Sequence, residues 1–159
     1  MSRFAELGVI ANAQPLWAQL DLTQTELTLP RIGHGRGGVQ YPLASLVRAG
    51  ARLAFGSDWP VSDHAPLAGL AVAVTREDAA RRPPGGWIPE QRLTLRRAVD
   101  AYTAGSAHQA FRDGESGTIR VGAAADLVAL GADPAARPAH ALAGIPVLGT
   151  WLAGRRTHG

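Results

Sequence analysis

An aspartate stands directly after a short apolar run in the segment RLAFGSDWPV, residues 52–61. The run 52–55 predicts a buried strand, and Gly56 and Ser57 let the chain turn before Asp58. In parallel α/β proteins the active site lies at the carboxyl ends of the strands. A carboxylate there can bind a divalent metal ion or accept a proton from a metal-held water. The alternative is that Asp58 only caps the following turn.

Other catalytic patterns are weaker. Ser57 is not a nucleophile elbow, because Phe55 and Trp59 occupy the outer glycine positions of that motif. The glycine cluster at 33–38 lacks the Gly-Lys-Ser/Thr sequence of a phosphate loop. None of the five histidines forms a His-x-His or His-x-x-x-His pair. His64 lies in the same loop as Asp58, where it could line a pocket or be a solvated loop histidine.

A second predicted strand, 9–13, is followed by Gln14-Pro15-Leu16-Trp17. Because parallel strands end at the same edge, these residues should face the same rim as Asp58. Gln14, Trp17 and Trp59 are therefore candidates for the wall of a substrate pocket. The alternative is that both tryptophans only pack beneath loops.

The order of elements predicts an α/β fold with parallel strands. Glycine and proline positions and apolar spacing predict a helix over 2–7, an irregular stretch over 16–40, and helices over 42–50 and 67–74. Only about two strand–helix units are present, and a stable sheet needs three or more strands. The chain therefore has the content of one part of a larger fold.

The second half of the chain changes character after Gly114. Thr94 predicts the start of a helix, which Gly105 separates from another helix over 103–111. The inward stripe of the first helix contains four residues: Leu95, Ala98, Val99 and Tyr102. Short strands are expected over 117–120, 127–130 and 147–152. These patterns divide the chain into an α/β part, 1–113, and a β part, 114–159.

The bulk composition excludes several classes of protein. The 159 residues are 46% hydrophobic and 18% charged, which suits a folded domain with a core. No cysteine is present, so a disulfide framework is excluded and a cytoplasmic location is expected. No apolar run is long enough to span a membrane. The net charge of +3 comes from scattered arginines, which does not predict nucleic-acid binding.

Two stretches resemble a known family closely: FGSDWPV, and the run GTIRVGAAADLVALGADP. With RFAELGVIANAQPLW and PEQRLTLRRAVDAYTAGSAHQAF, they resemble the C-terminal part of the metal-dependent amidohydrolase superfamily, specifically the YtcJ-like amidohydrolase family 3. The resemblance implies a (β/α)8 TIM-type barrel with a small β-sandwich. Strands 9–13 and 52–55 would be the seventh and eighth barrel strands, and Asp126 would lie in the turn entering a sandwich strand.

The same resemblance implies metal-dependent hydrolysis. Asp58 matches the aspartate that contacts the metal, most often zinc, and handles protons while water attacks a C–N bond of a small non-peptide amide substrate. The family's His-x-His and its other metal ligands have no counterpart in this sequence. Asp58 alone cannot hold a catalytic metal, which needs about three protein ligands.

We therefore expect a C-terminal fragment of an amidohydrolase, inactive unless another chain supplies the rest. A complementing N-terminal chain or a homo-oligomer formed through exposed strand edges would meet this need. The alternative is a non-catalytic remnant or assembly piece of an amidohydrolase-like protein.

Overall fold

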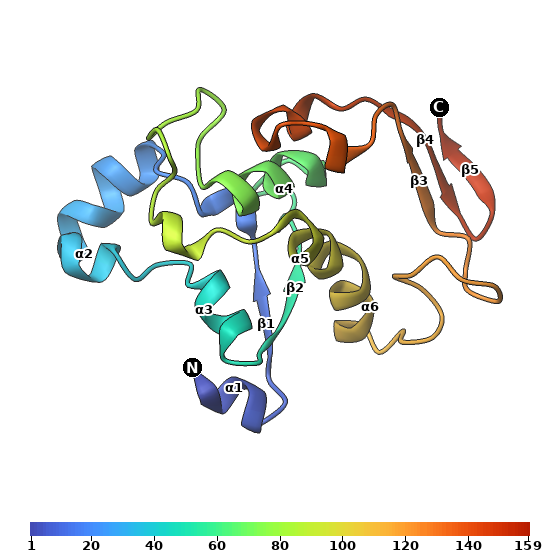
Figure 1. Ribbon diagram of the computed structural model, residues 1–159, viewed down its shortest axis with the longest axis horizontal. Helices are drawn as coiled ribbons and strands as arrows, with labels where there is room; N and C mark the ends of the chain where they lie inside the picture. The colour runs from blue at the N-terminus through green and yellow to red at the C-terminus, as the bar shows by residue number, and fades with distance from the viewer.

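The computed structural model describes residues 1–159 and shows a mixed α/β molecule with two separate sheets (Figure 1). The first is a parallel pair of β1 (Ile10–Ala13) and β2 (Arg52–Phe55). The second is antiparallel, in the order β3 (Leu127–Leu130), β4 (Val147–Leu152) and β5 (Arg155–His158). Figure 1 shows the second sheet at one end of the molecule, away from the parallel pair. The predicted strands in these two sheets are confirmed.

For the second sheet, one predicted strand is absent and one observed strand was not predicted. Residues 117–120 are not a strand, because the loop instead packs Gly117 against the preceding helical segment. The strand β5 was not predicted, since its four residues are polar and all exposed. It forms because Ala153 and Gly154 both have positive φ, 49° and 79°. That geometry makes the tight hairpin turn that pairs β4 with β5.

Six α-helices accompany the parallel pair. They are α1 (Ser2–Glu6), α2 (Leu29–Gly37), α3 (Leu43–Arg48), α4 (Pro66–Thr75), α5 (Leu95–Asp100) and α6 (Ser106–Gln109). None of them has the length and apolar character needed to cross a bilayer. The prediction of an irregular stretch over 16–40 was wrong, because a π-helical segment, Thr23–Thr28, leads into α2 there. This region is mostly exposed, so it carries no strong apolar periodicity to reveal a helix.

A single helical run extends through α5 and α6. The Thr94 hydroxyl accepts a hydrogen bond from the Arg97 amide at 3.3 Å, as the predicted N-cap requires. The π-helical turn η4 (Ala101–Gly105) joins the two helices, so Gly105 does not separate them. Val99 is 37% exposed and does not belong to the inward stripe. Each helical residue turns by roughly 100°, and buried Ala98 and Ala101 leave Val99 facing outward.

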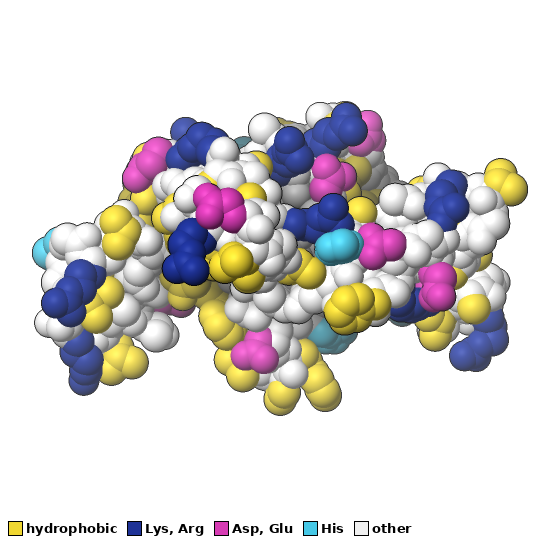
Figure 2. Space-filling view, turned by 90° about the horizontal axis from the view of Figure 1, so that it is seen from below, with side chains coloured by type: hydrophobic (Ala, Val, Ile, Leu, Met, Phe, Trp, Pro, Cys, Tyr) yellow, Lys and Arg dark blue, Asp and Glu magenta, His cyan; other side chains and the backbone are white.

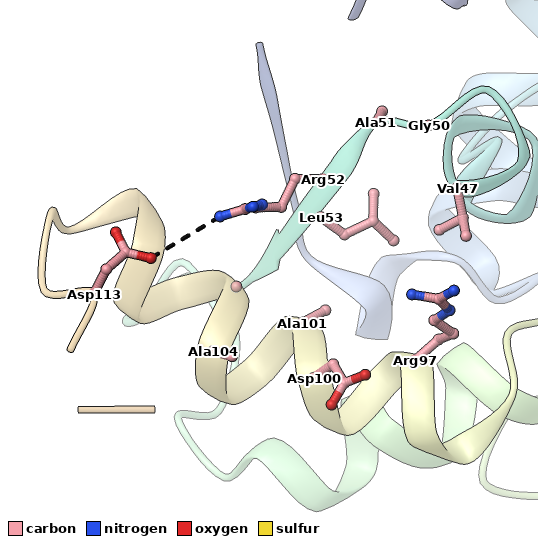
Figure 3. Close-up of a pocket in the computed structure, with 11 residues that line it drawn as sticks. Val47, Gly50, Ala51, Arg52, Leu53, Arg97, Asp100, Ala101, Ala104 and Asp113 are labelled. Atoms are coloured by element: carbon pink, nitrogen blue, oxygen red, sulfur yellow. Dashed lines mark ion pairs between the residues drawn. The ribbon is translucent and has the colours of Figure 1, made fainter. Parts of the chain in front are cut away.

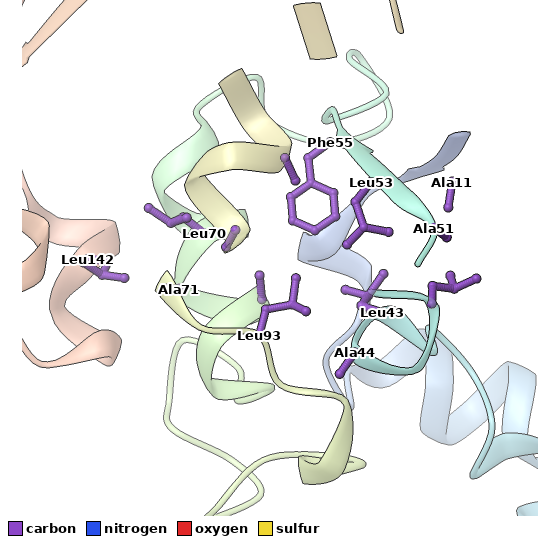
Figure 4. Close-up of a cluster of buried hydrophobic side chains, with 14 of the residues drawn as sticks. Ala11, Leu43, Ala44, Ala51, Leu53, Phe55, Leu70, Ala71, Leu93 and Leu142 are labelled. Carbon is purple, nitrogen blue, oxygen red and sulfur yellow. The ribbon is translucent and has the colours of Figure 1, made fainter. Parts of the chain in front are cut away.

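The core lies on one face of the parallel pair (Figure 4). Ala11, Leu53 and Phe55 point to this face and pack against α3 and α4, whose contributions include Leu43 and Leu70. Successive strand residues point to opposite faces, which places Asn12 and Arg52 on the other side, where both are exposed. On that other face Ala54 is nevertheless completely buried, so the main core lies on one face while the second face is partly covered.

The charged side chains do not form a single basic area on the face shown in Figure 2. Arginines lie scattered there among acidic and apolar side chains. The arrangement matches the scattered arginines of the sequence.

Tyr102 joins the helical run to α4 and β2. Its ring packs edge-on against Phe55, with 5.2 Å between centroids, and its hydroxyl approaches Gly69 of α4. Burial raises the pKa of Tyr102 to about 12, so the phenol stays neutral at physiological pH. A glycine at position 69 is required because a Cβ there would overlap the Tyr102 hydroxyl.

Arg76 is completely buried between two aromatic rings. Its guanidinium carbon lies 6.0 Å from the Tyr41 ring centroid and 5.5 Å from that of Trp87. Its Nε donates to the Trp87 carbonyl at 2.9 Å and its Nη1 to the Tyr41 carbonyl at 3.1 Å, while Nη2 has no partner. Burial lowers the pKa of Arg76 to about 10, which still leaves it charged at neutral pH. Arg76 thus ties the loop after α4 to the segment before α3.

We expect Gly69→Ala to lower the free energy of unfolding by about 1–3 kcal/mol, because the added methyl must displace the Tyr102 ring. Urea unfolding measures this change. Gly144→Ala is the matched control, since a Cβ at Gly144 meets no atom within 4 Å. Equal midpoints for the two variants would contradict the packing described here.

Arg76→Ala should destabilise the protein by about 3 kcal/mol, because two buried carbonyls lose their charged donor and a cavity remains. Arg76→Lys should give an intermediate loss, since an ammonium cannot reproduce the planar fork. The exposed Arg96 provides the control variant, Arg96→Ala, which should change stability by less than about 0.5 kcal/mol. Denaturant unfolding of the three variants side by side tests the predicted order of their stabilities.

Candidate active site at the carboxyl edge of the parallel strands

The carboxyl ends of β1 and β2 meet at one edge of the sheet. Ala13 is in register with Phe55, and the Gly56 amide donates to the Ala13 carbonyl at 3.2 Å just beyond the last pair. The residues that follow both strands therefore start from neighbouring points, as parallel pairing requires. This edge is where the sequence places Gln14 and Asp58.

A hydrogen bond joins the two loops that leave this edge. After β1, half-buried Gln14 leads into a 3-10 turn, Pro15–Trp17, in which Pro15 is buried. The Trp17 indole Nε1 donates to the Ser62 hydroxyl at 2.6 Å, across 45 residues of sequence. Sequence reasoning did not identify Ser62. A half-buried indole needs an acceptor, but the sequence gives no sign of which loop residue supplies it.

Asp58 lies in the loop that leaves β2. Its φ is +56°, in the left-handed region that aspartate adopts more readily than most side chains. Its carbonyl accepts from the Val61 amide at 2.8 Å, which closes a turn after the strand. The side chain is exposed, and its carboxylate takes part in none of the protein's ion pairs. An exposed, unpaired carboxylate at a strand end is available to a ligand.

The other two candidates in this loop project outward. Trp59 is 68% exposed. His64 is also exposed, and its Nδ1 lies 3.5 Å from a carboxylate oxygen of neighbouring Asp63. Trp17 is thus the tryptophan that packs between the loops, whereas Trp59 does not form a closed wall with it.

The residues present do not form a complete metal site. No group of three or more histidine, cysteine, aspartate or glutamate side chains is close enough together to hold an ion. Catalytic zinc sites use about three protein ligands, so Asp58 could supply one ligand of such a set but not the set itself. His108, on the helical run, is instead engaged by Asp113 at 2.8 Å.

Asp58 and the other four candidates line neither the cavity at the amino-terminal end of β2 nor the one beside α4. The larger, about 570 Å³, lies at the amino-terminal end of β2 between α3 and α5 (Figure 3). Ala51, just before the strand, and Leu53 of the strand line it together with Arg97 and Asp100 of α5. The smaller, about 160 Å³, lies beside α4 and includes Leu16, Gln19 and His140. The candidate residues therefore lie outside both of these cavities.

Comparison with known proteins finds one family model that matches almost the whole chain. The model of a family described as "Amidohydrolase family" matches residues 1–158. Protein LONG AFTER FAR-RED 3 of Arabidopsis thaliana is 35% identical over 133 residues, which are 81% of this chain and 21% of that protein. N-substituted formamide deformylase of Arthrobacter pascens is 32% identical over 114 residues, covering 72% of this chain and 20% of the relative.

YtcJ of Bacillus subtilis strain 168, described as an amidohydrolase, is 27% identical over 134 residues, 84% of this chain and 25% of its own length. The chain thus spans about a fifth to a quarter of these relatives. The crystal structure of an uncharacterized protein superposes with a TM-score of 0.62 at 21% identity. That alignment covers 99% of this chain and 37% of the other, and it shows a shared fold.

The isolated chain should not bind zinc tightly, because one carboxylate cannot replace about three ligands. Isothermal titration with zinc measures the affinity of the native chain and of Asp58→Asn. We expect weak binding that the substitution leaves unchanged. Stoichiometric, tight binding that Asp58→Asn removes would contradict the ligand set described above.

Proposed function

This chain belongs to the amidohydrolase family, and we propose that it forms the C-terminal part of a metal-dependent hydrolase acting on a C–N bond of a non-peptide amide. The family match confirms the resemblance read from the sequence motifs. One structural observation carries the proposal beyond family membership. It is the carboxylate of Asp58, exposed at the carboxyl edge of a parallel strand pair whose two loops are joined by the Trp17–Ser62 hydrogen bond.

The proposed architecture is a (β/α)8 barrel in which β1 and β2 are the last two strands. The one-sided core supports it, since helices cover the face bearing Ala11 and Leu53. In a closed barrel the other face would turn toward the interior, where side chains from further strands would cover it. Residues 1–113 would belong to this barrel.

Residues 114–159 would contribute a sheet to a small β-sandwich. Thr150 and Leu152 lie two residues apart on β4 and so share one face, and Val128 of β3 is in register with Thr150. Val128 and Leu152 are each more than half exposed. A second sheet packed on this face would bury them, as sandwiches require. Asp126, which enters β3, accepts from the Ala153 amide at 2.8 Å and fixes the start of the sheet.

Asp58 would act as the general base and acid of the reaction. Its carboxylate would take a proton from the water that attacks the amide carbon and pass that proton to the leaving nitrogen. The Asp58 side chain is exposed, and no intramolecular ion pair competes for its carboxylate.

A divalent metal, zinc above all, would activate the water in the assembled enzyme. This chain would supply Asp58 as one ligand, and residues outside it would supply the others, because the residues present do not fit a complete site. Gln14, Trp17, Trp59 and His64 would contact the small amide substrate once further loops close the rim. Activity would then need a complementing N-terminal segment.

The absence of a metal-ligand group also favours a second candidate, a non-catalytic assembly piece of an amidohydrolase-like protein. The two candidates differ in whether Asp58 contributes to turnover. A single chimeric protein distinguishes them.

In the chimera, this chain replaces the matched C-terminal segment of N-substituted formamide deformylase, and hydrolysis of an N-substituted formamide is assayed. We expect turnover, with Asp58→Asn lowering kcat by about a hundredfold or more, the usual contribution of a positioned acid–base group. Asp63→Asn, an exposed neighbour in the same loop, is the control and should retain activity. A folded, metal-loaded and active chimera that keeps full turnover with Asp58→Asn would refute the catalytic role.

A further inference from the structure

The loop between β2 and α4, residues 57–65, carries Asp58 but packs little against the rest of the protein. All of its residues are exposed except Ser57 and Ser62, which are half-buried. The hydrogen bonds that its backbone amides donate end on residues of the same loop. A loop with few buried contacts opens at a low cost in free energy. The position of Asp58 therefore depends on whatever else holds this loop in place.

The bond from the Trp17 indole to the Ser62 hydroxyl, 2.6 Å long, is the hydrogen bond that joins this loop to another segment. Trp17 lies in a turn that is itself packed on α4. Pro15 and Ala18, on either side of the turn, are fully buried, and Pro15 lies against Gly69 of α4. The Ala18 amide also donates to the Pro15 carbonyl at 3.0 Å. Ser62 is thus fastened to a well-held part of the molecule.

Ser62 directly follows the turn that begins at Asp58. The Val61 amide closes this turn on the Asp58 carbonyl at 2.8 Å, so a fixed Ser62 also restrains residues 58–61. Asp58 has a φ of +56°, a conformation that costs free energy for a residue other than glycine. Such a conformation persists only where surrounding contacts hold it. The Trp17–Ser62 bond provides a contact of this kind at the end of the turn.

We propose that Ser62 is a positioning residue for Asp58. Its hydroxyl ties the loop to Trp17 and so holds the Asp58 carboxylate at the carboxyl edge of β1 and β2. This inference rests on the proposed function, which gives Asp58 its role in proton transfer. Proton transfer requires the carboxylate to lie within hydrogen-bond reach of the reacting water, and a displacement of about 1 Å can lower turnover by about a hundredfold. Loss of the Ser62 hydroxyl would therefore lower turnover without removing a group that contacts the substrate.

Hydrogen exchange of the Val61 amide, followed by NMR, measures how often the Asp58 turn opens in the isolated chain. We expect Ser62→Ala to speed this exchange about fivefold, the factor that corresponds to one neutral hydrogen bond. Ser62→Thr keeps the hydroxyl and should leave the rate close to that of the unsubstituted chain. Ser116→Ala is the matched control, since Ser116 is also half-buried but its hydroxyl forms no hydrogen bond with the protein.

Trp17→Phe removes the donor of the same bond and keeps an aromatic ring. It should speed the Val61 exchange as much as Ser62→Ala does, and the double variant should exchange no faster than either single variant. Non-additivity of this kind identifies a single shared interaction. Unchanged exchange in both single variants, or accelerations that multiply in the double variant, would overturn the proposal.

The formamide deformylase chimera described above measures the effect on turnover. Ser62→Ala should lower kcat about tenfold and change KM by less than about twofold, because the substrate contacts remain. Ser62→Thr should restore kcat, and Ser116→Ala should leave it unchanged.

The two measurements separate this inference from the proposed function. A Ser62→Ala chimera with full kcat, in an enzyme that Asp58→Asn inactivates, would overturn the positioning role and leave the proposed function intact. An inactive parent chimera would count against the proposed function. The exchange rates in the isolated chain would still decide whether Ser62 holds the Asp58 turn.

Discussion

The parallel pairing of β1 with β2 is the constraint on which the rest of the structure depends. Because parallel strands cannot be joined by a tight turn, the chain between them must cross over, and it does so through α2 and α3. The same pairing brings both strand ends to one edge, where Trp17 and Ser62 join the following loops. It also determines which residues face the helices and which face away.

A two-stranded sheet with its main core on one face buries little apolar area. The stability of the fold therefore depends on close packing on that face. The contact of Gly69 with Tyr102 lets α4 and the helical run approach each other. Arg76 fastens the long loop after α4 through two backbone carbonyls and two aromatic rings. Both sets of contacts depend on a specific residue type, since a methyl group at position 69 or an ammonium at position 76 cannot make the same contacts.

The candidate residues gather at the carboxyl edge of the parallel pair. A carboxylate, an amide and two tryptophans stand at the edge where α/β enzymes carry their chemistry, yet they line neither of the two cavities described above and no set of metal ligands is complete. The chain spans only about a fifth to a quarter of the length of its matched relatives.

The sequence by itself determined the two parallel strands, five of the six helices, the Thr94 cap and the family, because these depend on local apolar patterns and on motifs such as FGSDWPV. It placed Asp58 at a strand end for the same reason. Only the tertiary structure showed the exposed α2 helix, the Ser62 acceptor, the buried Arg76 and the contact of Gly105 with Leu53. Each of these depends on segments distant in sequence or on a helix with little apolar patterning, and local patterns carry no information about which distant groups meet.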